Sequence, residues 1–208
     1  EMITIVNGVN DDNLTGSETI VSASSCTTNC LAPLLKIIED NFGIEKGFMS
    51  TVHAYTADQN SMDNMHKKGI NSRRGRASAH NIVPTSTGAA KSIGLVIPSL
   101  KGKLDGIAYR VPTIDGSMID VTLELKVPVT KELINETIKN NQNDAIKYTE
   151  DPIVSSDVIG KKRGCTFDSL LTNVIEVDGK QLVKLVGWYD NEYGYTYQML
   201  CTAKKMFK

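Results

Sequence analysis

The sequence lacks the features that mark membrane or nucleic-acid-binding proteins. None of its apolar runs approaches the roughly 20 residues that a membrane-spanning helix needs. Its 208 residues include 23 lysines and arginines against 24 aspartates and glutamates, a formal net charge of −1. That balance gives no reason to expect nucleic acid or an anionic membrane as a partner. The stretch 1–12 lacks a basic start and a long apolar core, so it does not read as a signal peptide.

Several chemical motifs are also absent. Four cysteines in a chain of this size do not suggest a disulfide scaffold, so a reducing, cytoplasmic setting fits best. No Cys-x-x-Cys or clustered histidine points to a metal site. Neither a Gly-x-Gly-x-x-Gly fingerprint nor a P-loop occurs, so the usual nucleotide-binding motifs are missing.

The hydrophobic pattern predicts an α+β fold, with a predominantly antiparallel or mixed sheet and helices on one face. We expect helices over 26–41, 88–97, 130–141 and 193–207, with Thr87 capping the second. Strands are expected over 21–24, 44–53, 104–111, 118–126, 165–171, 173–177 and 182–188, with a hairpin turn at 177–180. Residues 2–6 also read as a buried strand, but without preceding neighbours, so we expect a piece of something larger.

Cys26 stands where the segment 21–24 runs into the first predicted helix. Free N–H groups and the positive end of the helix dipole favour thiolate over thiol, so we expect a lowered pKa and a place for an oxyanion. The alternative is a cysteine packed in the core. Cys30, one turn later, is interpreted as a packed residue.

His53 ends the strand over 44–53, beside a long polar stretch from Ala57 to Asn81 that is typical of a functional loop. It could pair with Cys26 as a base, or be an ordinary hydrogen-bonded histidine. His66 and His80 lie within the loop and are interpreted as structural.

Four arginines and a helix start form a candidate anion site. Arginine gives bidentate contacts to phosphate, and a helix that begins after Thr87-Gly88 offers free backbone amides. The alternative for the loop arginines is a solvated face. The arginines are Arg73, Arg74, Arg76 and Arg110.

Six motifs together resemble those of the glyceraldehyde-3-phosphate dehydrogenases, in order along the chain. They are Ser-Cys-Thr-Thr-Asn-Cys at 25–30, Thr-Val-His-Ala-Tyr-Thr-Ala-Asp-Gln at 51–59, Arg-Arg-Gly-Arg-Ala at 73–77, Pro-Thr-Ser-Thr-Gly-Ala-Ala-Lys at 84–91, Arg-Val-Pro at 110–112 and Trp-Tyr-Asp-Asn-Glu-Tyr-Gly-Tyr at 188–195. The resemblance implies that 1–22 is the end of a dinucleotide-binding (Rossmann) domain and that 23–208 is the catalytic domain. It also implies that the helix over 193–207 packs on the cofactor domain.

The resemblance implies a role for each candidate site residue. Cys26 would attack the aldehyde of glyceraldehyde 3-phosphate, and His53 would take the proton and help hydride leave to NAD. Inorganic phosphate would then release 1,3-bisphosphoglycerate from the thioester. Ser25, Thr27, Arg74, Thr87 and Gly88 would hold the attacking phosphate, Thr56 and Arg110 the substrate phosphate, and Asn191 and Tyr195 the nicotinamide end of the cofactor.

The resemblance implies a cytoplasmic enzyme of glycolysis that assembles as a homotetramer. The loop over 57–81 would then line the cofactor and the subunit interface. Asn64-Met65 stands where a proline commonly helps to exclude NADP, so NADP stays an alternative cofactor. Three other functions stay open: an erythrose-4-phosphate dehydrogenase, a cysteine hydrolase that uses Cys26 and His53, and a non-catalytic binding fragment. The Thr87-Gly88 phosphate site argues against the first, and the two-phosphate set has no purpose in the second.

Overall fold

The computed structural model describes residues 2–60, 64–69 and 71–207. Its helices are α1 (Cys26–Phe42), α2 (Ala89–Val96), α3 (Lys131–Asn140) and α4 (Tyr193–Met206). Its strands are β1 (Ile3–Thr4), β2 (Val21–Ser22), β3 (Ile44–Ala54), β4 (Val83–Ser86), β5 (Leu104–Val111), β6 (Ser117–Leu125), β7 (Ile146–Thr149), β8 (Cys165–Asp168), β9 (Asn173–Val177) and β10 (Lys180–Tyr189). None of the described helices is long and apolar enough to cross a membrane.

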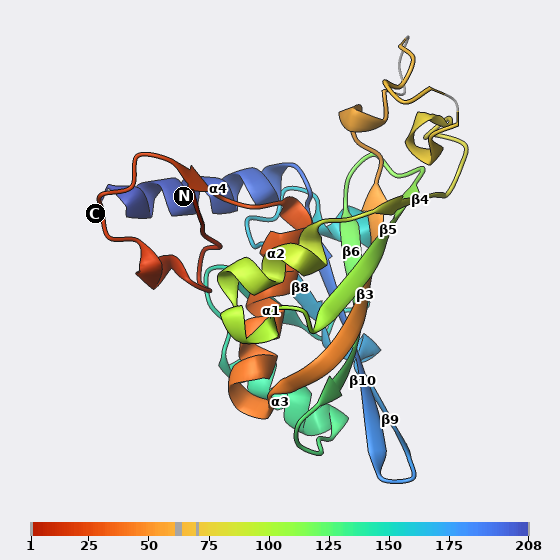
Figure 1. The fold of residues 1–208 in the computed structure, drawn as a ribbon. Coiled ribbons are helices and arrows are strands. Elements are labelled where there is room, and N and C mark those ends of the chain that lie inside the picture. The colour runs from red at the N-terminus through yellow and green to blue at the C-terminus, as the bar shows by residue number, and fades with distance from the viewer. Residues whose placement is uncertain (1, 61–63, 70, 208) are drawn as a thin grey trace.

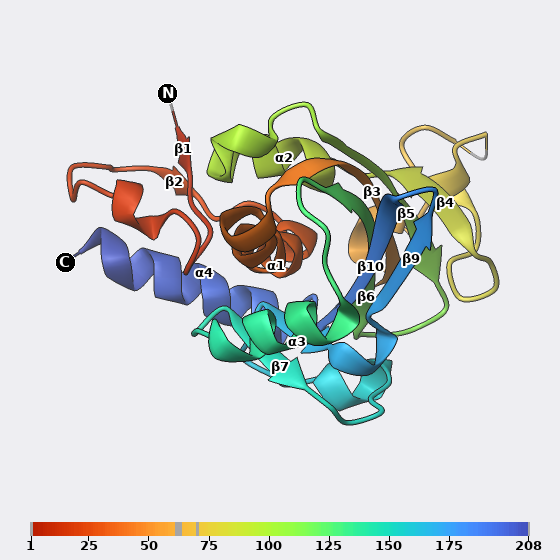
Figure 2. The ribbon, with the colours of Figure 1, turned by 90° about the horizontal axis from the view of Figure 1, so that it is seen from below.

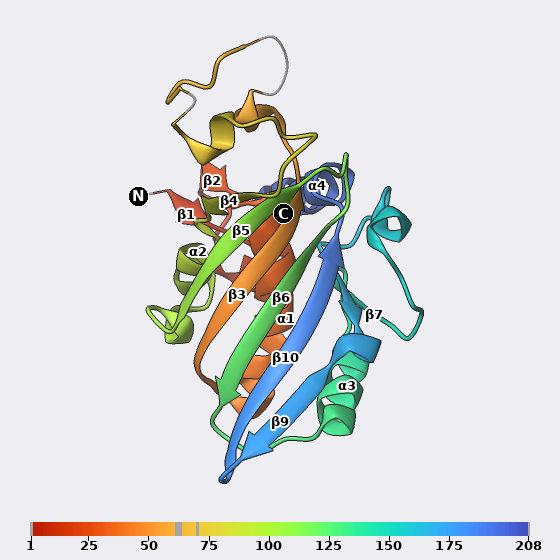
Figure 3. The same cartoon turned by 90° about the vertical axis from the view of Figure 1, so that its right-hand side faces the viewer.

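One mixed sheet dominates the molecule, in the order β4-β5-β3-β6-β10-β8-β7. The strand β9 pairs with the N-terminal half of β10. The pairs β3–β5 and β7–β8 are parallel, and the other pairs are antiparallel. Figure 3 shows one face of this sheet uncovered, with the helices behind it. The predicted α+β class with helices on one face is confirmed.

The central helix α1 follows from local signals at both of its ends. The Ser25 hydroxyl accepts a hydrogen bond from the Thr28 N–H at 3.1 Å, which caps the start. Gly43, with φ of 67°, ends the helix in a conformation that favours glycine. Between them a buried leucine and isoleucine stripe packs on the sheet, and α2 and α3 flank it (Figure 2).

Most of the predicted elements are present, with corrections at their edges. The strands at 104–111 and 173–177 are confirmed, and Asp178 and Gly179 both have positive φ, as the predicted hairpin turn requires. The strand predicted over 165–171 ends at Asp168, because that side chain accepts from the Leu170 N–H and caps a short turn. Helix α2 begins after Gly88, not after Thr87, although the Thr87 hydroxyl still accepts from the Ala89 N–H at 3.2 Å.

The N-terminal segment lies against α4. Strands β1 and β2 pair in parallel, and the segment that joins them lies next to this helix (Figure 1). The buried Asn7 side chain donates to Gln198 at 2.9 Å, and Lys205 pairs with Asp11. The Tyr195 hydroxyl, near the start of α4, donates to the Ser24 carbonyl at 3.0 Å. Helix α4 is thereby tied to the turn that precedes α1.

Candidate active site

The turn between β2 and α1 presents Cys26. Ser24 has a φ of 59°, a left-handed conformation that is uncommon for serine and often found at functional sites. Ser25 then caps the helix, so Cys26 is its first residue, next to N–H groups that the helix itself does not use. The cysteine is half-buried, as a nucleophile reached from a pocket must be.

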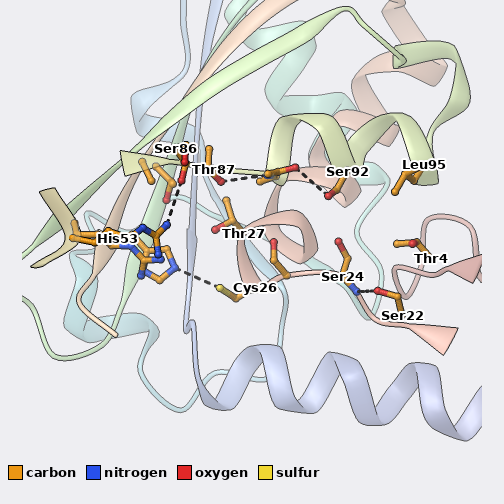
Figure 4. A pocket seen from close by; sticks show the side chains of 17 residues that line it. Thr4, Ser22, Ser24, Cys26, Thr27, His53, Ser86, Thr87, Ser92 and Leu95 are labelled. Carbon is orange, nitrogen blue, oxygen red and sulfur yellow. Dashed lines mark hydrogen bonds between the residues drawn. The ribbon is translucent and has the colours of Figure 1, made fainter. Parts of the chain in front are cut away.

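His53 faces Cys26 from the end of β3. Its Nε2 lies 3.4 Å from the Cys26 sulfur (Figure 4). Its Nδ1 lies 2.7 Å from the Ala54 carbonyl oxygen and 2.9 Å from Nη1 of Arg110. The two hydrogens of that Nη1 have acceptors of their own, the Ala54 carbonyl at 3.1 Å and the Thr56 hydroxyl at 3.0 Å. The His53 ring and the Nη1 of Arg110 both have their hydrogen bonds when Nδ1 carries the imidazole proton and donates it to the Ala54 carbonyl. The lone pair of Nε2 then points toward the Cys26 thiol.

The expected lowering of the Cys26 pKa is wrong for this structure. Burial raises the pKa of the Cys26 thiol above its usual value, and opposing effects of Thr27 and Arg110 are smaller. Burial and the charge of Arg110 lower the pKa of His53 to about 4. The pair is therefore a neutral thiol beside a neutral imidazole near pH 7, and His53 is the group that can take the thiol proton as the sulfur attacks.

Arg110 is placed by the sheet register. In the parallel pair β3–β5 it stands opposite His53, so both side chains reach the same end of the sheet. Its buried Nε atom has no hydrogen-bond partner among the described residues. A buried guanidinium N–H without a partner carries a desolvation cost that an anionic ligand in the pocket would remove.

A cavity of about 450 Å³ connects these groups. Arg74 enters it from the polar loop, held by its Nε donating to the Thr85 hydroxyl at 2.6 Å. Thr87 and the start of α2 also line it (Figure 4). Eight of the predicted site residues line this cavity: Ser25, Cys26, Thr27, His53, Arg74, Thr87, Gly88 and Arg110.

Three predicted site residues lie outside the cavity wall. Thr56 reaches it through its contact with Arg110. Asn191 is buried, and its carbonyl oxygen accepts from the Ser117 hydroxyl at 2.6 Å. Tyr195 holds the turn before the nucleophile, as described above.

Two residues of the site escaped the sequence analysis. The Tyr189 hydroxyl is fully enclosed between those of Thr27, at 2.9 Å, and Thr51, at 2.8 Å, and its ring meets that of His53 edge-on. Asp58 pairs with Arg74 in the polar loop. The sequence signal for Tyr189 was its position in the motif at 188–195. A tyrosine buried at a site needs a hydrogen-bond partner for its hydroxyl, which here is supplied by the two threonines.

The other cysteines and histidines are separate from the site. Cys30 and Cys165 are fully buried. Burial, and to a smaller extent the neighbouring Cys165, raises the pKa of Cys30 well above its usual value. His80 is exposed on the polar loop. Within the described residues no cluster of three or more metal-ligating side chains occurs.

The fold and the site define a class: an α+β domain in which a cysteine at a helix start faces a histidine at the rim of an arginine-lined cavity. Residues 25–191 match the family model described as "Glyceraldehyde 3-phosphate dehydrogenase, C-terminal domain". The chain therefore belongs to the glyceraldehyde-3-phosphate dehydrogenase family.

Curated relatives extend this similarity over the whole chain. The chain is 54% identical over 208 residues to a glyceraldehyde-3-phosphate dehydrogenase of Clostridium pasteurianum, covering 100% of the chain and 62% of the relative. It is 54% identical over 202 residues to that of Clostridium acetobutylicum (97% and 60%) and over 205 residues to that of Streptococcus pyogenes (99% and 61%). The chain thus spans about three fifths of the length of these relatives.

Proposed function

We propose that the chain is the catalytic part of a phosphorylating glyceraldehyde-3-phosphate dehydrogenase. The observation that carries the proposal is the Cys26–His53 contact of 3.4 Å at the rim of a cavity that both Arg74 and Arg110 line. A thiol beside a base forms covalent acyl intermediates, and two arginines suit a reaction that binds two phosphate groups, that of the substrate and inorganic phosphate.

The first step is attack by the Cys26 sulfur on the aldehyde carbon, with the thiol proton passing to Nε2 of His53. The backbone amides at the start of α1 stabilise the oxygen of the resulting hemithioacetal. Loss of hydride gives a thioester on Cys26. Inorganic phosphate, held by Ser25, Thr27, Arg74, Thr87 and Gly88, then attacks the thioester carbonyl and releases 1,3-bisphosphoglycerate. Thr56 and Arg110 hold the phosphate of the substrate throughout.

A nicotinamide cofactor, NAD or NADP, accepts the hydride when it is bound. Asn191 fits one end of it, because its amide nitrogen makes only a 3.3 Å contact with Glu192 and can still donate to a carboxamide. Tyr195 follows in the first turn of α4. The 208 residues contain no Gly-x-Gly-x-x-Gly, so this sequence offers no recognisable site for the pyrophosphate.

We propose a second domain and self-association on exposed apolar surface. Helix α4 leaves Met199 and Leu200 exposed, and Phe207 directly after the helix is exposed too, which suits packing against the cofactor domain. The helices leave one sheet face uncovered (Figure 3). Phe48 and Leu182 alternate with buried neighbours along β3 and β10, so they point to that face, as does Ile175, which pairs with Leu182. Phe48 is 73% exposed and the other two are also exposed, which suits a homotetramer. A cytoplasmic, glycolytic setting follows from the same proposal.

The function is tested by acylation that needs no cofactor. Incubation of the chain with 1,3-bisphosphoglycerate should transfer the 3-phosphoglyceroyl group to the Cys26 sulfur and release inorganic phosphate, because the thioester is the intermediate of both directions. Mass spectrometry of the intact chain and of its peptides locates the adduct, and Cys26→Ser is the control. An adduct on Cys201 instead of Cys26, or none in folded protein, would contradict the proposal.

The two arginines should serve different phosphates. In an active enzyme that carries these residues with a cofactor domain, Arg110→Ala should mainly raise the KM for the sugar phosphate, and Arg74→Ala the KM for inorganic phosphate. Each change removes a charge-assisted contact worth roughly 1.5–3 kcal/mol, an effect of about 10- to 150-fold. Steady-state kinetics with each substrate varied in turn measures both constants. Equal effects of either variant on both constants would show that the sites are not separable in this way.

A further inference from the structure

Asp58 links the two arginines of the cavity. Its carboxylate accepts from the Thr56 hydroxyl through one oxygen and pairs with Arg74 Nη1 through the other. Thr56 in turn accepts from Nη1 of Arg110 at 3.0 Å. The chain of contacts therefore runs from Arg110 through Thr56 and Asp58 to Arg74.

This arrangement places one carboxylate where two guanidiniums attract an anion. Arg110 lowers the pKa of Arg74, after the larger effect of burial, so the two cations repel each other across the cavity. The negative charge of Asp58 compensates part of that repulsion. It does so on the same hydroxyl and the same guanidinium to which the proposed function assigns phosphates.

The Asp58 contacts are easily replaced. The Arg74 side chain is 30% exposed and that of Asp58 is 44% exposed, and ion pairs as accessible as this contribute little to stability. Arg74 is also fixed without Asp58, since its Nε donates to Thr85 at 2.6 Å and its Nη2 to the Ser86 carbonyl at 3.3 Å. A ligand that displaced the carboxylate would find the guanidinium already in place.

We propose that Asp58 is an intramolecular counter-ion that competes with phosphate for Thr56 and Arg74 and so sets the anion affinity of the cavity. The inference rests on the proposed phosphate roles of these residues. When the two phosphate positions fill, the substrate phosphate replaces the carboxylate on the Thr56 hydroxyl, and inorganic phosphate replaces it on Nη1 of Arg74. A phosphate dianion binds these groups more strongly than the Asp58 carboxylate does, because it offers more charge and more acceptor oxygens.

The test is the affinity of the 208-residue chain for inorganic phosphate, measured by titration calorimetry at low ionic strength. Asp58→Ala removes the competing acceptor, and Asp58→Asn removes only its charge. Both should bind phosphate about five- to tenfold more tightly than the unaltered chain, from the lost ion pair and the lost repulsion of the anion. Asp40→Asn is the matched control: it removes the same charge from the exposed Lys36–Asp40 pair, about 20 Å along α1 from Cys26.

The outcomes separate this inference from the proposed function. Tighter binding by both Asp58 variants, with Asp40→Asn unchanged, supports competition. Weaker or equal binding by the Asp58 variants, while the unaltered chain binds phosphate, overturns the inference and leaves the phosphate sites standing. Binding by none of the folded proteins, with folding checked by circular dichroism, rejects the phosphate sites and the inference together.

Discussion

Replacement of His53 by asparagine should slow acyl transfer to Cys26 by about 10²–10⁴-fold, the range that a positioned general base contributes. The reason is the protonation state of the pair. Burial raises the pKa of the Cys26 thiol, so the sulfur carries its proton near neutral pH. The pKa of His53 is lowered to about 4, so its Nε2 is free to take that proton at 3.4 Å. Without the imidazole, only the small thiolate fraction can attack.

The measurement is the rate of p-nitrophenolate release from p-nitrophenyl acetate near neutral pH. His80→Asn is the matched control, because it makes the same substitution at an exposed histidine of the polar loop. Cys26→Ser gives the background rate. Equal rates for His53→Asn and His80→Asn would show that the helix start alone activates Cys26 and that His53 has a structural role.

The parts of this site that sequence could predict depend on local chemistry. Ser25 and Gly43 delimit α1 through a cap and a positive φ, both of which act within a few residues of their own position. The sequence analysis placed Cys26 at a helix start from the hydrophobic pattern over 26–41, which these local signals delimit. Its partner His53 was placed correctly at the end of a strand, but only the folded sheet brings β3 over the start of α1.

The parts that sequence could not predict depend on tertiary contacts. The pKa of Cys26 was expected to fall because of the helix start, but the burial that raises it is set by the whole fold. Two strands were missed at the two edges of the sheet. β4 contains Pro84, which argues against a strand but is tolerated at an edge, and β7 has only four residues.

The purified 208-residue chain should keep thiol acyl transfer and lack dehydrogenase activity. Acylation requires a nucleophile, a base and an oxyanion site. Cys26, His53 and the amides at the start of α1 supply all three within the described structure. Acyl transfer from an activated ester therefore needs no further domain.

Hydride transfer has a different requirement, because the nicotinamide must be held against the hemithioacetal on Cys26. Positioning of this kind can account for roughly 7–11 kcal/mol of a barrier. Asn191 and Tyr195 can contact only one end of the cofactor, and the sequence carries no fingerprint for the pyrophosphate. Without that binding energy the cofactor would rarely occupy a reactive position, so NADH formation should fall to the background.

The assay follows NADH formation from glyceraldehyde 3-phosphate, NAD and phosphate by the absorbance of the reduced nicotinamide, beside p-nitrophenolate release by the same sample. Cys26→Ser controls both reactions. Robust NADH formation by the chain alone would prove the division of labour wrong, since these residues would then position the whole cofactor. Absence of acyl transfer in folded protein would mean instead that Cys26 depends on the cofactor domain for its reactivity. The neutral thiol–imidazole pair would then be an inactive state, which the cofactor domain converts into a reactive one.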